Sequence, residues 1–272
     1  MAVASCRGEG PGHLIGTAVL TLACAIGAGV ATAQPAPVCV PPPAGMVAWW
    51  PGDGTTSDLI GGNKGMWVGS AAYTAGEVGQ AFSLNGSSWV QVPSTAGLSP
   101  TGAITIDAWI NTTTTNATSR IVDKITAGGG DGYLLDLLRG RLRLLIDSTS
   151  VTGSTTLQPG VTYHVAGTYD GSTLTVYLDG VSDGTSLFSG AIPTSSLPVR
   201  IGADSSGANT FSGWIDEVEI FNRALSSTEV QAIRNALNAG KCKPQVIPAT
   251  STLGLALIGL LVLAAGLLLL RR

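Results

Sequence analysis

Hydrophobic and polar residues alternate through the middle of the chain. The clearest case is residues 161–180, in which two alternating stretches flank Tyr169-Asp170-Gly171-Ser172 and end at Asp179-Gly180. A period of two is typical of a strand with one buried face, and Asp-Gly between two such runs is typical of a tight turn. The segment therefore predicts an antiparallel hairpin. Two strands bury too little apolar surface to be stable alone, so more strands of the same kind are expected.

Such runs recur at short intervals and are separated by Gly-, Asn- and Asp-containing turns. The further predicted strands are residues 46–50, 66–68, 81–84, 89–92, 103–111, 120–126, 133–138, 142–147, 197–201 and 211–221. Many short strands with regular turns predict an all-β fold, an antiparallel β-sandwich. Around Leu142 to Leu145, Arg141 and Arg143 share one face of a strand, which we expect to be a solvent-exposed face.

One short helix is expected after the last strand. Ser226 and Glu229 have the spacing of a capping box, and Leu225 and Val230 can form a hydrophobic staple. The apolar residues 230, 233 and 237 follow at helical spacing, and Gly240 can end the helix. Its apolar side should pack on the sandwich.

The N-terminus predicts a signal peptide at residues 1–33. An uncharged apolar run, 14–30, follows Arg7 and precedes Ala31-Thr32-Ala33, which predicts cleavage between Ala33 and Gln34. A lipoprotein acceptor at Cys24 and a retained N-terminal helix are the alternatives. A Pro-rich linker follows at residues 34–44.

The C-terminus predicts a membrane anchor. Residues 253–270 are Leu, Ala, Gly, Ile and Val only, and Arg271-Arg272 ends the chain. That length spans a bilayer, and the arginines should stay on the cytoplasmic side. Residues 253–272 are therefore predicted as a transmembrane helix with an arginine tail, and the preceding domain is expected to be exported.

Residues 45–243 are predicted as one domain. From Cys39 to Lys243 the chain carries 11 Lys and Arg against 16 Asp and Glu, a net charge of −5, and it has no basic stripe for nucleic acid. Cys39 and Cys242 flank the domain. In an exported protein this pair predicts one disulfide between them, because a two-thiol metal site would need further Cys or His ligands.

Five segments resemble the laminin-G-like, concanavalin A-like jelly-roll family of bacterial exported proteins. They are residues 47–54 (VAWWPGDG), 79–86 (GQAFSLNG), 105–110 (TIDAWI), 163–171 (YHVAGTYDG) and 215–226, which begins IDEV and ends NRALS. They cover nearly all of residues 45–238 in order. The resemblance implies an antiparallel jelly-roll sandwich. It leaves the function open, because this fold carries lectins, adhesion modules and glycosidases alike.

The tail resembles a second family, the exosortase-type sorting tails of Gram-negative bacteria. Residues 244–252 contain Ile247-Pro248, similar to a sorting motif that begins Ile-Pro-Thr-Leu, but Ala249 and Thr250 replace Thr-Leu. The resemblance implies a sorting protease as a partner. It also implies a cell envelope location, either anchored in the inner membrane or sorted to the cell surface or extracellular matrix. A plain C-terminal anchor is the alternative.

Laminin-G-like folds often hold a structural calcium, and such a site takes carboxylate oxygens. By alternation, Asp216 shares a face with Trp214, Val218 and Ile220, so its carboxylate should be buried and need a partner. We expect Asp53 and Asp216 to meet if the first and last strands are neighbours, with Asp58 as a weaker ligand. The alternative is that backbone N–H groups or Arg223 hold Asp216.

Glycosidase activity is the sharpest alternative function. Glu217 and Glu219 project to one face, and retaining enzymes need two carboxyls about 5–5.5 Å apart. Related glucanases use Glu-x-Asp-x-x-Glu, and here Trp214 stands at the first Glu, so solvated charges explain the pair better. His164 has no nucleophile at a suitable spacing and is interpreted as a hydrogen-bonded strand residue.

The six tryptophans offer a weak indication of sugar binding. Each lies on a predicted strand, where core packing is the usual role. Trp49 and Trp50 are adjacent, so they point to opposite faces, and one must leave the core or be covered. We expect a non-catalytic binding or adhesion module for polysaccharide or an envelope protein. A glycoside hydrolase or lyase, and a structural matrix protein without a specific ligand, remain as alternatives.

Overall fold

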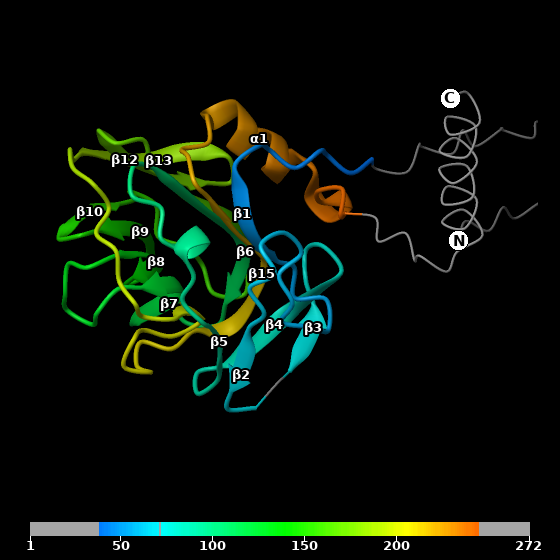
Figure 1. The fold of residues 1–272 in the computed structure, drawn as a ribbon. Coiled ribbons are helices and arrows are strands. Elements are labelled where there is room, and N and C mark those ends of the chain that lie inside the picture. The colour runs from blue at the N-terminus through cyan, green and yellow to red at the C-terminus, as the bar shows by residue number, and fades with distance from the viewer. Residues whose placement is uncertain (1–37, 71, 245–272) are drawn as a thin grey trace, which may run out of the picture. The chain divides into compact units, whose positions relative to one another are not determined.

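Two antiparallel sheets stack face to face in the computed structural model, which describes residues 38–70 and 72–244 (Figure 1). The eight-stranded sheet runs β13-β12-β11-β6-β15-β4-β3, with β1 also paired to β15. Its strands are β1 (Met46–Trp50), β3 (Tyr73–Ala75), β4 (Gln80–Asn85), β6 (Ile104–Thr112), β11 (Thr162–Tyr169), β12 (Thr173–Leu178), β13 (Val181–Leu187) and β15 (Ser212–Phe221).

The second sheet has seven strands in the order β10-β9-β8-β7-β14-β5-β2. They are β2 (Met66–Val68), β5 (Trp89–Val92), β7 (Thr118–Lys124), β8 (Tyr133–Leu138), β9 (Arg141–Ile146), β10 (Thr149–Thr152) and β14 (Val199–Ile201). The predicted sandwich is therefore confirmed. Three strands were missed, β3, β10 and β13; β13 in particular is rich in Ser, Asp, Gly and Thr, so it carries no apolar alternation.

The apolar core lies between the sheets and follows the predicted alternation. On β6 it takes residues 104, 106, 108 and 110, and on the hairpin β11–β12 it takes Val165, Tyr169, Leu174 and Val176. Gly167 lies between them because a Cβ there would come within 2.9 Å of Leu135 on the facing sheet. The predicted hairpin is a mid-sheet pair between β13 and β6.

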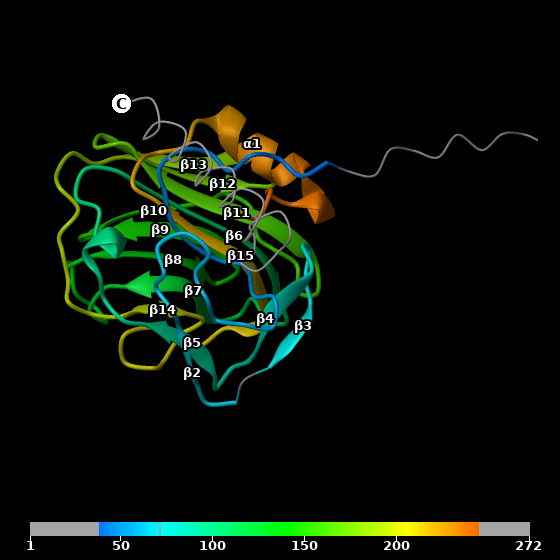
Figure 2. The same ribbon diagram turned by 45° about the vertical axis from the view of Figure 1, so that its right-hand side comes forward.

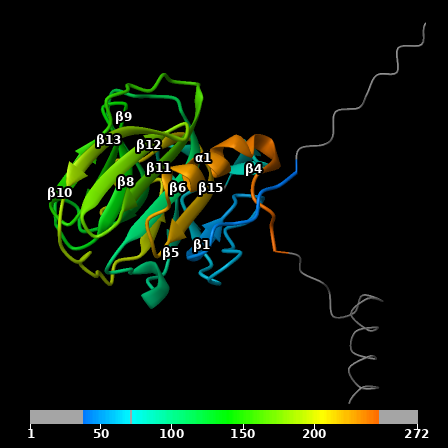
Figure 3. The same cartoon turned by 90° about the horizontal axis from the view of Figure 1, so that it is seen from above.

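Helix α1 (Ser227–Asn235) lies over the outer face of the eight-stranded sheet (Figures 2 and 3). Both halves of the predicted capping box are formed between Ser226 and Glu229. Val230 and Ile233 pack on Ala166, Tyr177, Phe221 and Leu225. Leu237 was wrongly placed on this apolar stripe: the chain tightens into a 3₁₀ turn, η2 (Leu237–Ala239), which leaves Leu237 45% exposed. Another such turn, η1 (Ala96–Leu98), precedes β6.

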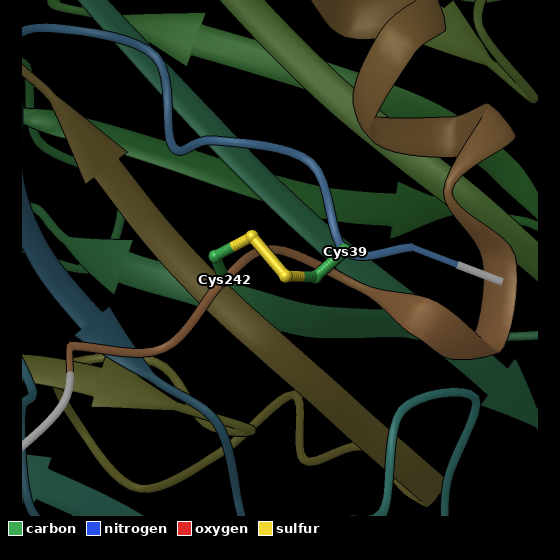
Figure 4. The surroundings of a disulfide bond; sticks show 2 residues. All are labelled: Cys39 and Cys242. Atoms are coloured by element: carbon green, nitrogen blue, oxygen red, sulfur yellow. A yellow bond between two sulfur atoms is a disulfide. The ribbon is translucent and has the colours of Figure 1, made fainter. Parts of the chain in front are cut away.

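After η2 the chain crosses β15, and we call residues 240–243 the strap. Val40 forms a parallel bridge with Lys241, with Val40 N–H donating to the Gly240 carbonyl at 3.0 Å and Cys242 N–H to the Val40 carbonyl at 2.8 Å. The predicted disulfide joins Cys39 to Cys242 across 203 positions of sequence (Figure 4). Part of the predicted linker is thus fastened to the end of the domain.

No helix within residues 38–70 and 72–244 is long and apolar enough to cross a membrane. The predicted signal peptide with its cleavage site between Ala33 and Gln34, the sorting motif at Ile247 and Pro248, and the transmembrane segment lie outside the residues that the structure describes.

Candidate functional site

A row of polar side chains crosses the outer face of the seven-stranded sheet. Adjacent members are cross-strand partners or next to them in register, so one row extends over five strands. From β9 to β5 its members are Arg143, Asp136, Arg120 with Asp123, Arg200 and Gln91. The alternate residues of the same strands, such as Leu135, Leu142 and Leu144, fill the core.

A β-bulge places two of these residues together. The β7–β8 register shifts between Arg120 and Val122, so that Ile121 and Val122 both lie in the core. As a result Arg120 and Asp123, three positions apart, both face outward, and Arg120 Nε lies 3.0 Å from Asp123 Oδ2. A simple period of two would have put them on opposite faces.

Asp136 lies at the centre of the ion pairs in this row. It is fully buried, and Arg143 donates to it twice, from Nε to Oδ1 at 3.0 Å and from Nη2 to Oδ2 at 2.6 Å. Arg120 Nη1 also contacts Asp136 Oδ2. One buried carboxylate therefore orients two guanidinium groups. The expectation that Arg143 lies on a merely solvated face is wrong, whereas Arg141 is exposed as expected.

The two arginines open into a cavity of about 350 Å³. Leu134 and Leu145 supply apolar walls, and the glycine-rich loop 126–130 supplies the rim. Asp131 holds this loop by accepting hydrogen bonds from both the backbone N–H and the hydroxyl of Thr126, at 2.7 Å each. A side chain at position 130 would displace the Asp147 carboxylate, because a Cβ there would lie 2.5 Å from Asp147 Oδ1.

Asp123 has an unusual proton affinity. Burial raises its pKa to about 7, and the charges of Asp204 and Asp136 act in the same direction, although Arg120 and the Ile125 N–H oppose them. Its carboxyl therefore exchanges a proton near neutral pH. Perturbed carboxyls gather at functional sites more often than elsewhere, which supports this row as the site.

The row continues to an aromatic ring beyond the cavity. Arg200 Cζ lies 5.5 Å from the centre of the Trp89 ring, and Arg200 Nε donates to Gln91 at 3.2 Å. Trp89 is only partly buried. Donors fixed by carboxylates, with apolar walls and an aromatic ring nearby, can bind hydroxyl-rich ligands.

The three carboxylates predicted to hold calcium do not form one set of ligands. Both oxygens of Asp58 are occupied by N–H donors. Oδ1 accepts from Trp49 N and Ile60 N, and Oδ2 accepts from Gly61 N and from both nitrogens of Asn63, all at 2.7–3.1 Å. Asp58 therefore shapes its own loop.

Asp53 and Asp216 lie near each other, but a lysine already neutralises the first of them. Asp53 Oδ1 accepts from Gln80 N at 2.8 Å, and Oδ2 contacts Lys243 Nζ. Asp216 accepts from Val78 N at 2.9 Å, and its Oδ1 has no hydrogen-bond partner within the described part of the chain. Burial raises the pKa of Asp216 to about 8, with Glu217 and Asp53 adding to the shift, so it is protonated at neutral pH.

These residues do not fit a calcium site. Asp58 is saturated by N–H donors and Asp53 is paired with Lys243, so of the three only Asp216 keeps a carboxylate oxygen without a protein partner among the described residues, and calcium takes several such oxygens. Within residues 38–70 and 72–244, no group of three or more His, Cys, Asp or Glu side chains is placed to hold a metal ion.

Calcium is therefore expected to leave the melting temperature unchanged. Thermal unfolding of the wild type and of Asp216→Asn, with millimolar calcium and with EDTA, measures this directly. A rise in the wild type that the variant lacks would show instead that Asp216 is a calcium ligand.

The strand β15 explains why its acidic residues were misplaced. A bulge between Asp216 and Glu219 puts Glu217 at φ 51° and shifts the register, so Val218 and Ile220 enter the core while Asp216 faces outward beside Trp109. Asp216 therefore does not share a face with those two residues, as alternation predicted.

Glu217 and Glu219 are not solvated charges. Both are fully buried on the outer face of the sheet, covered by the strap. Lys241 Nζ lies 2.5 Å from Glu219 Oε1 and 3.4 Å from Glu217 Oε2. The pKa of Lys241 is raised, because these carboxylates outweigh its burial. Two carboxylates sealed beneath a lysine cannot reach a glycan.

Neither predicted sugar-stacking ring is available. Trp50 is in the core, whereas Trp49 lies on the opposite face, where its Nε1 donates to Glu217 at 3.0 Å, and both rings are fully buried. His164 is a hydrogen-bonded strand residue as expected, with Nε2 3.2 Å from Asp107 Oδ1. The residues that line the cavity were missed, because their only sequence signal was Arg143 alternating with leucines.

The comparisons with known proteins agree with this architecture. A model of the concanavalin A-like lectin/glucanases superfamily, Laminin_G_3, matches residues 84–231. A comparison with curated proteins found no match.

Several solved structures share the fold. Domain 4 of an extracellular arabinanase from Geobacillus stearothermophilus, solved with arabinotriose, is 22% identical with a TM-score of 0.57, and the match covers 68% of this chain and 96% of that one. The binding domain of Paraclostridial Mosquitocidal Protein 1 is 17% identical with a TM-score of 0.57, over 71% of this chain. The binding domain of botulinum neurotoxin serotype C1 is 13% identical with a TM-score of 0.55, over 71% of this chain.

The chain spans about half of each toxin domain, at 52% in both cases. At these identities the likeness shows the fold alone, whereas the family model covers more than half of the 272 residues. The chain therefore belongs to the concanavalin A-like lectin/glucanases superfamily, with a domain of the Laminin_G_3 type.

Proposed function

We propose that the domain binds a carbohydrate in the cavity beside Arg120 and Arg143 and does not cleave it. The observation that carries this proposal is the pair of guanidinium groups, fixed by a buried Asp136 and directed into a cavity with apolar walls. Sugars offer both hydroxyl acceptors and apolar ring faces, so such a surface is complementary to them. The arabinanase domain solved with arabinotriose supports a sugar ligand by analogy of fold.

A location outside the cytoplasm is part of the same proposal. The disulfide between Cys39 and Cys242 favours an oxidising compartment. Together with the predicted signal peptide and sorting tail, it supports an exported adhesion module. The module is either anchored in the inner membrane by its C-terminal helix or sorted to the cell surface by an exosortase-type protease. Fractionation of producing cells, followed by detection of the domain in the envelope and the medium, tests this location.

Glycan binding without turnover is the expected result of a direct test. The chain, purified in detergent as cells produce it, is applied to a broad glycan array and then incubated with every glycan that binds. Specific binding without release of reducing sugar supports the proposal. Turnover would show a hydrolase or lyase, and absence of both would favour a structural matrix protein.

A further inference from the structure

The walls of the cavity carry the positive ends of the ion pairs and not the negative ones. Arg120 and Arg143 line the cavity, whereas Asp136, which pairs with both, does not and is fully buried. A ligand in the cavity therefore meets two guanidinium groups before any carboxylate that neutralises them.

Each arginine keeps donor capacity for a ligand. Arg143 uses Nε and Nη2 on Asp136, and Arg120 uses Nη1 on Asp136 with Nε beside Asp123. Within residues 38–70 and 72–244, Arg143 Nη1 and Arg120 Nη2 make no hydrogen bond to another residue. Because a guanidinium has a fixed planar geometry, fastening one edge also fixes the direction of the remaining N–H groups.

The acidic residue on the cavity wall is turned towards the rim. A Cβ on Gly130 would lie 2.5 Å from Asp147 Oδ1, so that oxygen faces the loop 126–130. Asp123, the second acid next to Arg120, is held largely neutral below pH 7 by its burial. When Asp123 is protonated, Asp136 is the remaining carboxylate paired with the two arginines within the described residues, and Asp147 is the carboxylate on the cavity wall.

We propose that this cavity binds the ionised carboxylate of an acidic sugar, a uronate unit of a polysaccharide, through Arg120 and Arg143. This rests on the proposed carbohydrate-binding function and names its ligand class. The guanidinium groups are largely buried, with side chains 9% exposed for Arg120 and 17% for Arg143. Such groups bind an ionised oxygen more strongly than a neutral hydroxyl, and two of them can hold both oxygens of one carboxylate. The apolar walls at Leu134 and Leu145 then contact the sugar ring.

The test compares two ligands that differ only in charge. Oligogalacturonate and the same oligomer with its carboxyls reduced to alcohols are titrated by calorimetry into the chain purified in detergent. We expect binding of the acidic oligomer and at least about tenfold weaker binding of the reduced one, because a charge-assisted hydrogen bond is lost.

Two variants locate the binding. Arg143→Gln is expected to weaken oligogalacturonate binding by at least about tenfold. Arg141→Gln, which removes the same charge from the same face of β9 but outside the cavity, is expected to leave binding unchanged. Arg143→Lys keeps the charge without the planar fork and should bind at an intermediate level. Thermal unfolding of each variant shows that the protein tested is folded.

The pH dependence gives a readout that a merely structural arginine would not produce. Binding of the acidic oligomer should be tighter at pH 6 than at pH 8, because Asp123 loses its proton as the pH rises through about 7 and adds a negative charge beside Arg120. The groups that face Asp123 are Arg120, Arg200, Asp136, Asp204 and Tyr133. Binding of the reduced oligomer should not change over this range.

Each result decides between the two proposals. Equal binding of both oligomers, lowered equally by Arg143→Gln, would retain carbohydrate binding at this site and overturn the acidic class. If Arg143→Gln and Arg141→Gln weaken oligogalacturonate binding equally, the ligand does not bind in the cavity, and the proposed site is overturned. Binding of a sulfated oligomer but not of a carboxylated one would overturn the assignment of a uronate as the ligand. No binding to any glycan on the array would overturn the proposed function itself.

Discussion

Replacing Lys241 with methionine is expected to lower the free energy of unfolding by about 3–5 kcal/mol. Lys241 is 3% exposed, and its ammonium lies between Glu217 and Glu219, both fully buried on β15, and 5.4 Å from the centre of the Trp49 ring. Methionine retains most of the packing volume but leaves Glu219 without its cation, and leaves Glu217 with Lys243 alone, whose Nζ lies 3.5 Å from Glu217 Oε1. Removal of one partner from a buried ion pair costs far more than the pair itself contributes, because the remaining charge stays desolvated. Urea denaturation followed by tryptophan fluorescence measures the loss.

Two matched variants separate lost charge pairing from lost packing. Lys64→Met removes a lysine from an exposed position and should change stability by less than about 0.5 kcal/mol. Adding Glu219→Gln to Lys241→Met removes the carboxylate closest to the ammonium and should recover a large part of the loss. If the double variant is no more stable than Lys241→Met alone, the buried charge is not the cause, and the strap is held by other contacts.

The features of this fold that depend on residues close in sequence could be predicted from the sequence. The alternation in β6, β11 and β12 predicted which residues enter the core, and the Ser226–Glu229 spacing predicted the helix start. The cysteine pair predicted the covalent closure of the domain. Each of these rests on neighbours in sequence, or on two residues of a rare type.

The candidate site depended on features without a local signature. One bulge in β7 brings Arg120 and Asp123 to the same face, and another in β15 turns Asp216 outward. A bulge shifts alternation by one residue, so a single alternating pattern cannot assign the residues on both sides of it to the correct face. Glu217 and Glu219 are also buried by Lys241, which is distant in sequence and reaches β15 only in the folded protein.

Loss of the disulfide is expected to have a comparable effect and to act through the same strap. Cys39→Ser with Cys242→Ser should lower the free energy of unfolding by about 2–5 kcal/mol, because the bond closes a loop of 203 positions and restricts the unfolded chain. Removal of the disulfide also loosens the strap around Lys241. The two backbone hydrogen bonds that attach the strap to Val40, from Val40 N–H to the Gly240 carbonyl and from Cys242 N–H to the Val40 carbonyl, lie next to the disulfide. Thermal unfolding with and without reductant, and a count of two additional thiols after reduction, measure the bond and its contribution.

A double-mutant cycle shows whether the disulfide and Lys241 stabilise the strap together or independently. If the disulfide holds Lys241 on its carboxylates, Lys241→Met should cost less in the Cys39→Ser, Cys242→Ser background than in the wild type, because the strap is already partly released there. Contacting residues show such interaction energies at about 0.5–3 kcal/mol in double-mutant cycles. Strict additivity would mean that the buried ion pairs hold the strap without help from the bond, and that the disulfide acts only on the unfolded chain.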